Sequence, residues 1–249
     1  MLARGFPRPR NSRRAHAIRR AAWRRLVALG IALLAVVGCR AVLLPEGATI
    51  PLADVRPDEA LEVARAALPQ RFTVLNAVVL KKFGKSISTL GYTTVDEPAD
   101  SITVAILSPA GVKLFEASQV AGREDVRYVA DPLAELGDVA EVVLRDIRRM
   151  YFDRLPAPGS AWKRKGERLV FSQGAGNTRL EYIFAGTPAL PIRKKSFEGR
   201  RKAWVVSYQD HEWHGAYLFP RTMVLEDEKQ GYELLVRLLE VASTDGTGS

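Results

Sequence analysis

The sequence predicts an α+β fold: a strongly curved antiparallel sheet, forming an incomplete barrel, with helices covering the open face. Three observations support this fold class. Apolar residues recur with a period of two in two long runs, and short turns join the segments of each run, as in antiparallel hairpins. A helical segment precedes each run, and the second of these segments is amphipathic. Several segments are apolar on both faces, so both sides of the sheet are expected to be covered.

The chain begins with an arginine-rich segment. Residues 1–25 contain nine arginines and no acidic residue, and the 13 uncharged residues Leu26–Gly38 follow. A basic segment, a short apolar segment and a small residue before the cleavage point make up an export signal. Thirteen helical residues extend about 20 Å, less than the roughly 30 Å hydrocarbon layer. We therefore expect residues 1–38 to be a signal peptide.

The formal net charge of +9 comes from this segment. Nine of the 37 lysines and arginines lie in it, which leaves 28 basic residues against 28 acidic ones. A protein that binds nucleic acid concentrates positive charge on the folded domain. The neutral remainder therefore argues against a nucleic-acid partner.

Cys39 is the only cysteine, and it follows Val36-Val37-Gly38. An internal disulfide is therefore excluded. These four residues resemble the bacterial lipobox, in which an aliphatic, a variable and a small residue precede cysteine. The resemblance implies cleavage before Cys39 and a lipid anchor on its thiol, with acyl chains such as palmitate. Arg40, where aspartate would favour inner-membrane retention, favours the outer membrane. An uncleaved signal anchor over Leu26–Leu44 is the alternative, at the cost of an arginine in its apolar run.

Four regions follow from these patterns: the signal peptide at 1–38, a proline- and glycine-punctuated tether at 39–56, one domain at 57–242 and a polar tail at 243–249. The tail is predicted to be disordered. The first helix is predicted at Pro57–Leu68, because proline and acidic residues begin it and Pro69 ends it. The four strands predicted after it are Phe72–Lys82, Ser86–Val95, Ser101–Leu107 and Val112–Val120.

The second helix is predicted at Pro132–Tyr151. Asp131 precedes it as a cap, and an apolar stripe that includes Leu144 runs along one face. The five strands predicted after it are Trp162–Ser172, Arg179–Phe184, Ala203–Gln209, Ala216–Glu226 and Tyr232–Val241.

This order of elements resembles the fold shared by the periplasmic lipoprotein carrier and its outer-membrane lipoprotein receptor, the Lol-type proteins. The segments that carry the resemblance are Pro57–Leu68, Phe72–Val120 with Ser108–Glu116, Pro132–Tyr151 and Pro220–Val241. The sequence looks closest to outer-membrane lipoproteins of unknown function built on that fold. The resemblance implies a half-barrel whose open face is covered by helices and which encloses an apolar cavity.

The faces of the strands indicate where a ligand would bind. Phe72–Leu80 is apolar on both faces, more than one helix-covered side requires. An apolar cavity inside the curve of the sheet would account for this. The residues predicted to line it are Val78, Tyr92, Phe184, Trp204 and Tyr217. Ordinary core packing of the aromatic residues is the alternative interpretation.

No motif for catalysis or for a cofactor is found. His211-Glu212-Trp213-His214 has its histidines three apart, whereas the zinc-protease pattern needs four on a helix. A polar hairpin tip is the interpretation favoured over a metal site. Gly-x-Ser-x-Gly is absent, and Gly174–Asn177 reads as a turn rather than a phosphate loop. The sequence therefore predicts a protein that is not an enzyme and has no cofactor.

Three basic clusters lie in or near predicted turns: Lys163–Lys165, Arg193–Lys195 and Arg200–Lys202. They are interpreted as solvated hairpin ends, with contact to anionic lipid as the alternative. The functional hypothesis is a lipoprotein anchored to the periplasmic face of the outer membrane. It would hold a lipid or acyl chain and take part in lipid or lipoprotein handling in the cell envelope. The alternative is an envelope assembly factor that binds a protein partner.

Overall fold

The structure of the chain is a computed structural model that describes residues 55–134 and 138–244. The predicted signal peptide, Cys39, nearly all of the tether and residues 245–249 lie outside the described residues. Within the described ranges, no helix has the length and apolar composition that crossing a membrane requires.

The described helices are α2 (Pro57–Ala67), α3 (Asp131–Ala134) and α4 (Val139–Tyr151). Pro57 begins α2, where a missing backbone N–H costs no helical hydrogen bond. Asp138 caps α4, and its side chain accepts a hydrogen bond from the backbone N–H of Glu141 at 3.0 Å. The prediction of one continuous helix over Pro132–Tyr151 was therefore wrong, because α3 and α4 are separate elements and α4 has its own cap.

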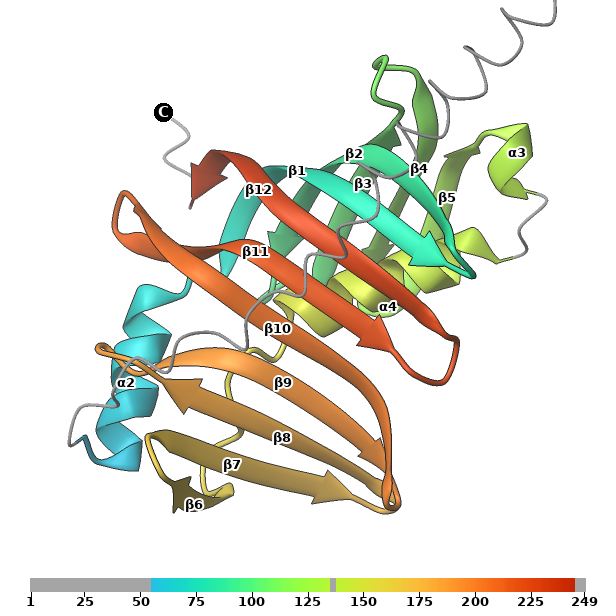
Figure 1. Ribbon diagram of the computed structural model, residues 1–249. Helices are drawn as coiled ribbons and strands as arrows, with labels where there is room; N and C mark the ends of the chain where they lie inside the picture. Colours follow the sequence, from blue (N-terminus) through green and yellow to red (C-terminus); the bar gives the residue numbers. More distant parts are fainter. Residues whose placement is uncertain (1–54, 135–137, 245–249) are drawn as a thin grey trace, which may run out of the picture. The chain divides into compact units, whose positions relative to one another are not determined.

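Twelve strands lie in the described part of the chain, and they form one antiparallel sheet (Figure 1). Their order in the sheet is β5-β4-β3-β2-β1-β12-β11-β10-β9-β8-β7-β6. The strands are β1 (Arg71–Lys82), β2 (Lys85–Asp96), β3 (Ser101–Leu107), β4 (Lys113–Val120), β5 (Arg123–Val129), β6 (Ala161–Lys165), β7 (Arg168–Ala175), β8 (Thr178–Ala185), β9 (Leu190–Glu198), β10 (Arg201–His214), β11 (Tyr217–Asp227) and β12 (Tyr232–Thr244).

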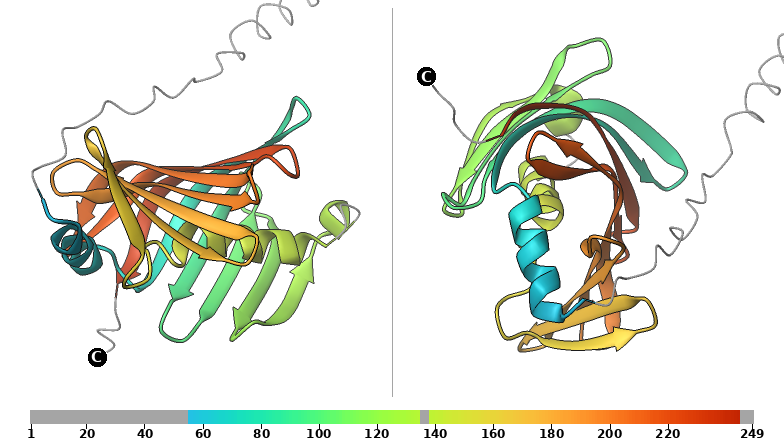
Figure 2. Two further views of the ribbon diagram at one scale, coloured as in Figure 1. Left: turned by 90° about the horizontal axis from the view of Figure 1, so that it is seen from below. Right: turned by 90° about the vertical axis from the view of Figure 1, so that its left-hand side faces the viewer.

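The pairing of β1 with β12 joins two meanders, β1–β5 and β6–β12, into that one sheet. Val78 of β1 lies opposite Val236 of β12, and the register shifts after Thr73 and after Leu75. Such bulges increase the local twist of a sheet. The sheet curves around α2 and α4 (Figure 2), and its outermost strands β5 and β6 do not pair with each other. This arrangement confirms the predicted fold class.

Two apolar cores lie on the concave side of the sheet. The first packs α4 against β1–β4 and β10–β12, and its fully buried side chains include Phe115, Leu144 and Leu225. The second packs the alanine face of α2 against β7–β9, where the rings of Phe171 and Phe184 lie 5.2 Å apart. Both cores lie between residues 55 and 241, within the compact unit Ala48–Ser249. This unit therefore has its own hydrophobic interior and is expected to fold without residues 1–47.

Three strands differ from the sequence prediction. The predicted strand Trp162–Ser172 is the hairpin of β6 and β7, which turns at Gly166 with a φ of 56°. The strands β5 and β9 were not predicted. Six of the seven residues of β5 are exposed, so no apolar alternation marks it. Basic residues interrupt β9, although one of them, Lys194, is buried.

Candidate ligand-binding site

A cavity of about 380 Å³ lies between α4 and the concave face of β1, β2, β3 and β12. The side chains of alternate residues on each strand face it, because successive side chains of a strand point to opposite faces. Its walls are mainly apolar and comprise Asn76, Val78, Leu80 and Lys82 of β1, Ile87, Thr89, Gly91 and Thr93 of β2, Val104 and Ile106 of β3, Tyr232, Leu234 and Val236 of β12, Leu133 of α3, Asp138, Gln230, and Val139, Val142, Val143, Asp146, Ile147, Met150 and Tyr151 of α4.

Small side chains on the sheet leave this space open. Gly91 lies at the centre of the β2 wall, directly opposite Asn76 of β1. A Cβ atom added to Gly91 would lie 3.5 Å from Cγ2 of Val78, an ordinary van der Waals contact. A side chain at position 91 would therefore fit the backbone and project into the cavity.

The cavity has a closed end and an open end. Along β1 the lining residues change from Asn76, which is 2% exposed, through the half-buried Val78 and Leu80 to the exposed Lys82. The C-terminal end of α4 lies at the closed end, where its buried residue Tyr151 lines the cavity. The cavity therefore opens toward the tip of the β1–β2 hairpin.

A polar pair lies at the closed end. The side-chain amide of Asn76 donates a hydrogen bond to the hydroxyl of Tyr151 at 3.1 Å, while the other polar atom of the amide, Oδ1, has no hydrogen-bond partner. Burial raises the pKa of the Tyr151 hydroxyl above its ordinary value. The hydroxyl is therefore protonated at neutral pH, and this polar pair carries no charge.

A buried charge cluster borders the cavity on the side of α4 and β12. The hydroxyl of Tyr232 donates a hydrogen bond to Oδ2 of Asp146 at 2.5 Å. Arg149 lies between two buried carboxylates, 3.1 Å from Oδ1 of Asp146 and 2.8 Å from Oδ2 of Asp227. Burial raises the pKa of Asp146, and the hydrogen bond from Tyr232 and the charge of Arg149 oppose that shift. Two members of the cluster, Asp146 and Tyr232, are themselves part of the cavity wall.

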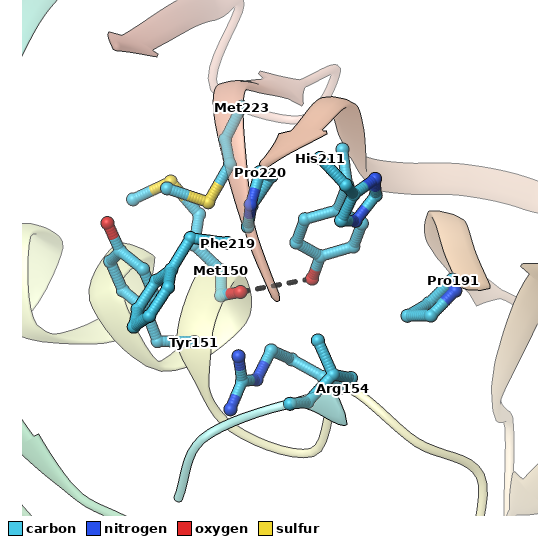
Figure 3. A pocket seen from close by; sticks show the side chains of 10 residues that line it. Met150, Tyr151, Arg154, Pro191, His211, Phe219, Pro220 and Met223 are labelled. Atoms are coloured by element: carbon cyan, nitrogen blue, oxygen red, sulfur yellow. Dashed lines mark hydrogen bonds between the residues drawn. The ribbon is translucent and has the colours of Figure 1, made fainter. Parts of the chain in front are cut away.

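A second cavity, of about 10 Å³, lies beyond the closed end (Figure 3). Arg154, His211 and Phe219 are among the side chains that surround it, and the hydroxyl of Tyr208 donates to the carbonyl of Met150 at 3.0 Å. Burial and the charge of Arg154 lower the pKa of His211 to about 4, so this imidazole is neutral at pH 7. The space holds about one water molecule and is too small for an acyl chain.

A third hollow, of about 440 Å³, has a charged lining near the C-terminal ends of α2 and α4. Arg148 lies 2.6 Å from a carboxylate oxygen of Asp100, and Arg154 lies 3.7 Å from Glu97. Arg148 and Arg154 thus pair with carboxylates of the lining, and Arg65 and Asp153 add further charged side chains to it. It therefore does not offer an apolar surface, and the cavity beside α4 is the candidate site for an apolar ligand.

The five residues predicted from the sequence to line a cavity lie in different places. Val78 lines the cavity beside α4. Tyr92 is 45% exposed on the opposite face of β2 from Gly91. Phe184 belongs to the second core, under α2. Trp204 packs at the border of the first core, where the guanidinium of Arg149 lies 5.2 Å from its ring centroid, and Tyr217 also packs against that core.

Sequence reasoning missed most of the cavity wall. The alternation that contains Val78 also contains Leu80 and Lys82, and all three line the cavity beside α4. The α4 wall, Val139 to Met150, lies along the predicted helix, but its sequence does not say which residues face a space and which pack tightly. The β12 wall depends on the pairing of β1 with β12, which no local pattern indicates.

The other motifs lie away from the cavity. His211 and His214 lie in the last four residues of β10, next to the turn of the β10–β11 hairpin. The ring of His214 packs edge-on against that of Phe219, with centroids 5.7 Å apart. No group of three or more metal-ligating side chains is found among the residues that the structure describes. The basic cluster Lys163–Lys165 is exposed on β6, whereas Lys194 of the second cluster is buried and donates to the carbonyl of Phe152 at 2.9 Å.

No protein-family model matches the chain, and no curated protein matches it. Among solved structures it is similar to a LolA superfamily protein from Nitrosomonas europaea, with 12% identity, a TM-score of 0.49 and coverage of 77% of this chain and 94% of that one. It is also similar to a DUF1329 family protein from Desulfovibrio piger, with 11% identity and a TM-score of 0.47, and to a putative outer membrane lipoprotein-sorting protein domain from Vibrio parahaemolyticus, with 10% identity and a TM-score of 0.45; each alignment covers 77% of this chain and 92% of the other.

Proposed function

We propose that the protein is a non-enzymatic component of the cell envelope that binds a lipid or acyl chain in the cavity between α4 and the sheet. The observation that carries this proposal is the cavity of about 380 Å³ with mainly apolar walls and one open end. Its volume lies in the usual range for ligand pockets, about 300–1,000 Å³. The polar pair at its closed end is neutral, and Lys82 and Asp138 lie at the open end, so the ligand would place its apolar chain inside and its polar group at the mouth.

The expected affinity follows from the buried apolar surface. An acyl chain that buries about fifteen methylenes gains about 12 kcal/mol. Association and ordering cost about 4 kcal/mol or more, which leaves at most about 8 kcal/mol and a Kd near or above 1 μM. Binding at this level suits a protein that must also release its ligand.

A fluorescent fatty acid tests the proposal on residues 48–249. We expect saturable binding with a Kd in the micromolar range. Replacing Gly91 by leucine is expected to weaken binding at least tenfold without unfolding the protein, because the new side chain fills the cavity and the backbone at Gly91 accepts a Cβ. Titration of the probe measures the affinity, and a melting curve checks the fold.

The matched control is Tyr92→Leu, which places the same side chain one residue along β2 on the opposite, exposed face. We expect Tyr92→Leu to bind the probe as the unmodified unit does. Equal binding by Gly91→Leu would place the ligand outside this cavity. If the folded unit shows no saturable binding, the assembly factor that binds a protein partner becomes the better hypothesis.

We also propose that Cys39 carries the lipid anchor and places the domain on the periplasmic face of the outer membrane. Replacing Cys39 by serine is expected to abolish incorporation of labelled palmitate, because the thiol is the atom that is alkylated and this chain has no other cysteine. The neighbouring substitution Arg40→Ser should retain the label. Incorporation into the Cys39→Ser chain would contradict an anchor at Cys39, whereas absence of label from the unmodified chain would favour the signal-anchor alternative.

A further inference from the structure

The tip of the β1–β2 hairpin presents a bare aromatic ring to solvent. We define the KKFGK tip as Lys81–Lys85, in which Phe83 and Gly84 form the two-residue turn after the last strand pair, Lys82 with Lys85. The side chain of Phe83 is 86% exposed, more than any other large apolar side chain in the described part of the chain. No contact within the described fold buries this ring, so the fold does not explain its presence.

The backbone at Phe83 makes the residue still harder to explain by folding alone. Phe83 has a φ of 49° and Gly84 a φ of 74°, the two positive angles of a type I′ turn. Asparagine or glycine is favoured at the first position, whereas a bulky residue there is strained. Strain that the surrounding structure does not require is a reason to look for a function at the tip.

The ring is surrounded by positive charge. Lys81, Lys82 and Lys85 are exposed, and the tip contains no acidic residue. Lys81 lies 2.8 Å from a carboxylate oxygen of Glu233 on β12. Lys82 and Lys85 have no carboxylate within ion-pair distance in the described part of the chain. The tip therefore combines an exposed apolar ring with at least two uncompensated ammonium groups.

The tip lies at the mouth of the cavity. The ammonium of Lys82 is 5.5 Å from the ring centroid of Phe83 and 5.9 Å from that of Tyr232, which lines the cavity. Leu80 and Ile87 pair directly across the hairpin, and both line the cavity. The β1–β2 and β11–β12 hairpins project side by side at this end (Figure 2). Apolar side chains thus lead from the tip into the cavity.

We propose that the KKFGK tip docks on an anionic lipid surface, with Phe83 inserted at the boundary between headgroups and acyl chains and Lys82 and Lys85 against the anionic headgroups. An aromatic ring beside basic side chains suits this interface, because burial of the ring and attraction to the headgroups act together. A stable protein interface buries about 800 Å² on each partner, far more than one ring offers. Docking would place the cavity mouth at the bilayer surface, and it requires no ligand in the cavity.

Vesicle flotation with residues 48–249 tests the proposal without a lipid anchor. We expect this unit to float with vesicles of phosphatidylcholine that contain one third phosphatidylglycerol, and not with phosphatidylcholine alone. Replacing both Lys82 and Lys85 by glutamine should weaken partitioning about 25-fold, since each lysine near an anionic surface contributes about fivefold. Phe83→Asn should weaken it about tenfold, through loss of the buried ring.

Phe83→Asn also separates docking from folding. Because Asn-Gly is the preferred type I′ sequence, this variant should melt at the same temperature as the unmodified unit or higher. The matched controls are Val112→Asn, at another exposed apolar residue beside a hairpin glycine, and Lys163→Gln with Lys165→Gln on the exposed strand β6. Both controls should partition normally.

The proposal would be overturned by no flotation with anionic vesicles, by equal flotation of the tip variants and the unmodified unit, or by losses as large in the controls as in the tip variants. Flotation that does not depend on phosphatidylglycerol would also overturn it, because the lysines would then have no role. Each of these results leaves the fatty-acid titration unaffected, so failure of docking is distinguishable from failure of ligand binding.

Discussion

Replacing Leu144 by aspartate is expected to lower the free energy of unfolding at neutral pH by at least about 3 kcal/mol. Leu144 is 0% exposed in the first core, on the face of α4 that packs against the sheet. The substitution removes the apolar contacts of the leucine and buries a carboxylate without a cationic partner. Both terms act in the same direction, and together they are among the largest effects of a single substitution.

Urea unfolding of residues 48–249, followed by circular dichroism, measures this effect. The control is Leu239→Asp, the same chemical change at an exposed position of β12. That variant should unfold close to the unmodified unit, because its carboxylate remains in water. Equal unfolding midpoints for Leu144→Asp and the unmodified unit would mean that α4 does not form part of the core.

Replacing Arg149 by methionine is expected to cost about 3–5 kcal/mol at neutral pH, although methionine fills much of the same volume. Arg149 is the cation between the buried carboxylates of Asp146 and Asp227, at 3.1 and 2.8 Å. Without it both carboxylates remain buried, and Arg145, 3.7 Å from Asp146, is the nearest remaining cation to that side chain. Removing one member of a buried ion pair costs more than the pair contributes, because the other charge stays without compensation.

The loss should also depend on pH, with a sign that Asp146 determines. Burial already raises the pKa of Asp146, and loss of Arg149 removes an interaction that lowers it. A carboxyl whose pKa is higher in the folded than in the unfolded state favours folding below its unfolded pKa, and that advantage is lost as pH rises through its folded pKa. The deficit of Arg149→Met relative to the unmodified unit should therefore be smaller at pH 4.5 than at pH 7.5.

Urea unfolding at the two pH values measures this difference. Adding Asp146→Asn to Arg149→Met should recover part of the stability at pH 7.5, because the second substitution removes one uncompensated charge. Arg71→Met, which breaks an exposed ion pair with Asp96, should change stability little at either pH. A deficit of Arg149→Met that stays constant between pH 4.5 and 7.5 would assign the effect to packing around Trp204 rather than to charge.

The local elements were largely predictable, because their signals are local. Proline and acidic residues begin α2 as predicted, and alternation places β1, β2 and β3 within one residue at each end. The strand β5 escaped prediction because nearly all of its side chains are in water, and β9 because buried Lys194 interrupts its apolar pattern. A strand is recognised in a sequence when buried apolar residues alternate with exposed polar ones. In β5 almost no residue is buried, and in β9 one of the buried residues is a lysine.

The candidate site shows where local signals stop. Large aromatic side chains suggested a cavity wall, yet Phe184 packs beneath α2. The space is lined mainly by aliphatic side chains, together with Gly91, Tyr151 and Tyr232, and none of these three was predicted to line it. Large rings bury the most area when they fill space, so they gather in the cores. The cavity remains where the aliphatic side chains of the strands and of α4 do not meet.

The sequence by itself determined an α+β domain, the order of its helices and most strands, and the face of β1 on which Val78 lies. Only the tertiary structure decided that β1 pairs with β12, that α4 lies beside Gly91 and that Phe83 lies at the mouth of the space between them. The physical reason is that side-chain periodicity is a property of neighbouring residues. A cavity is the volume left when a twelve-stranded sheet curves further from a helix than their side chains reach, and no segment of the chain contains that volume.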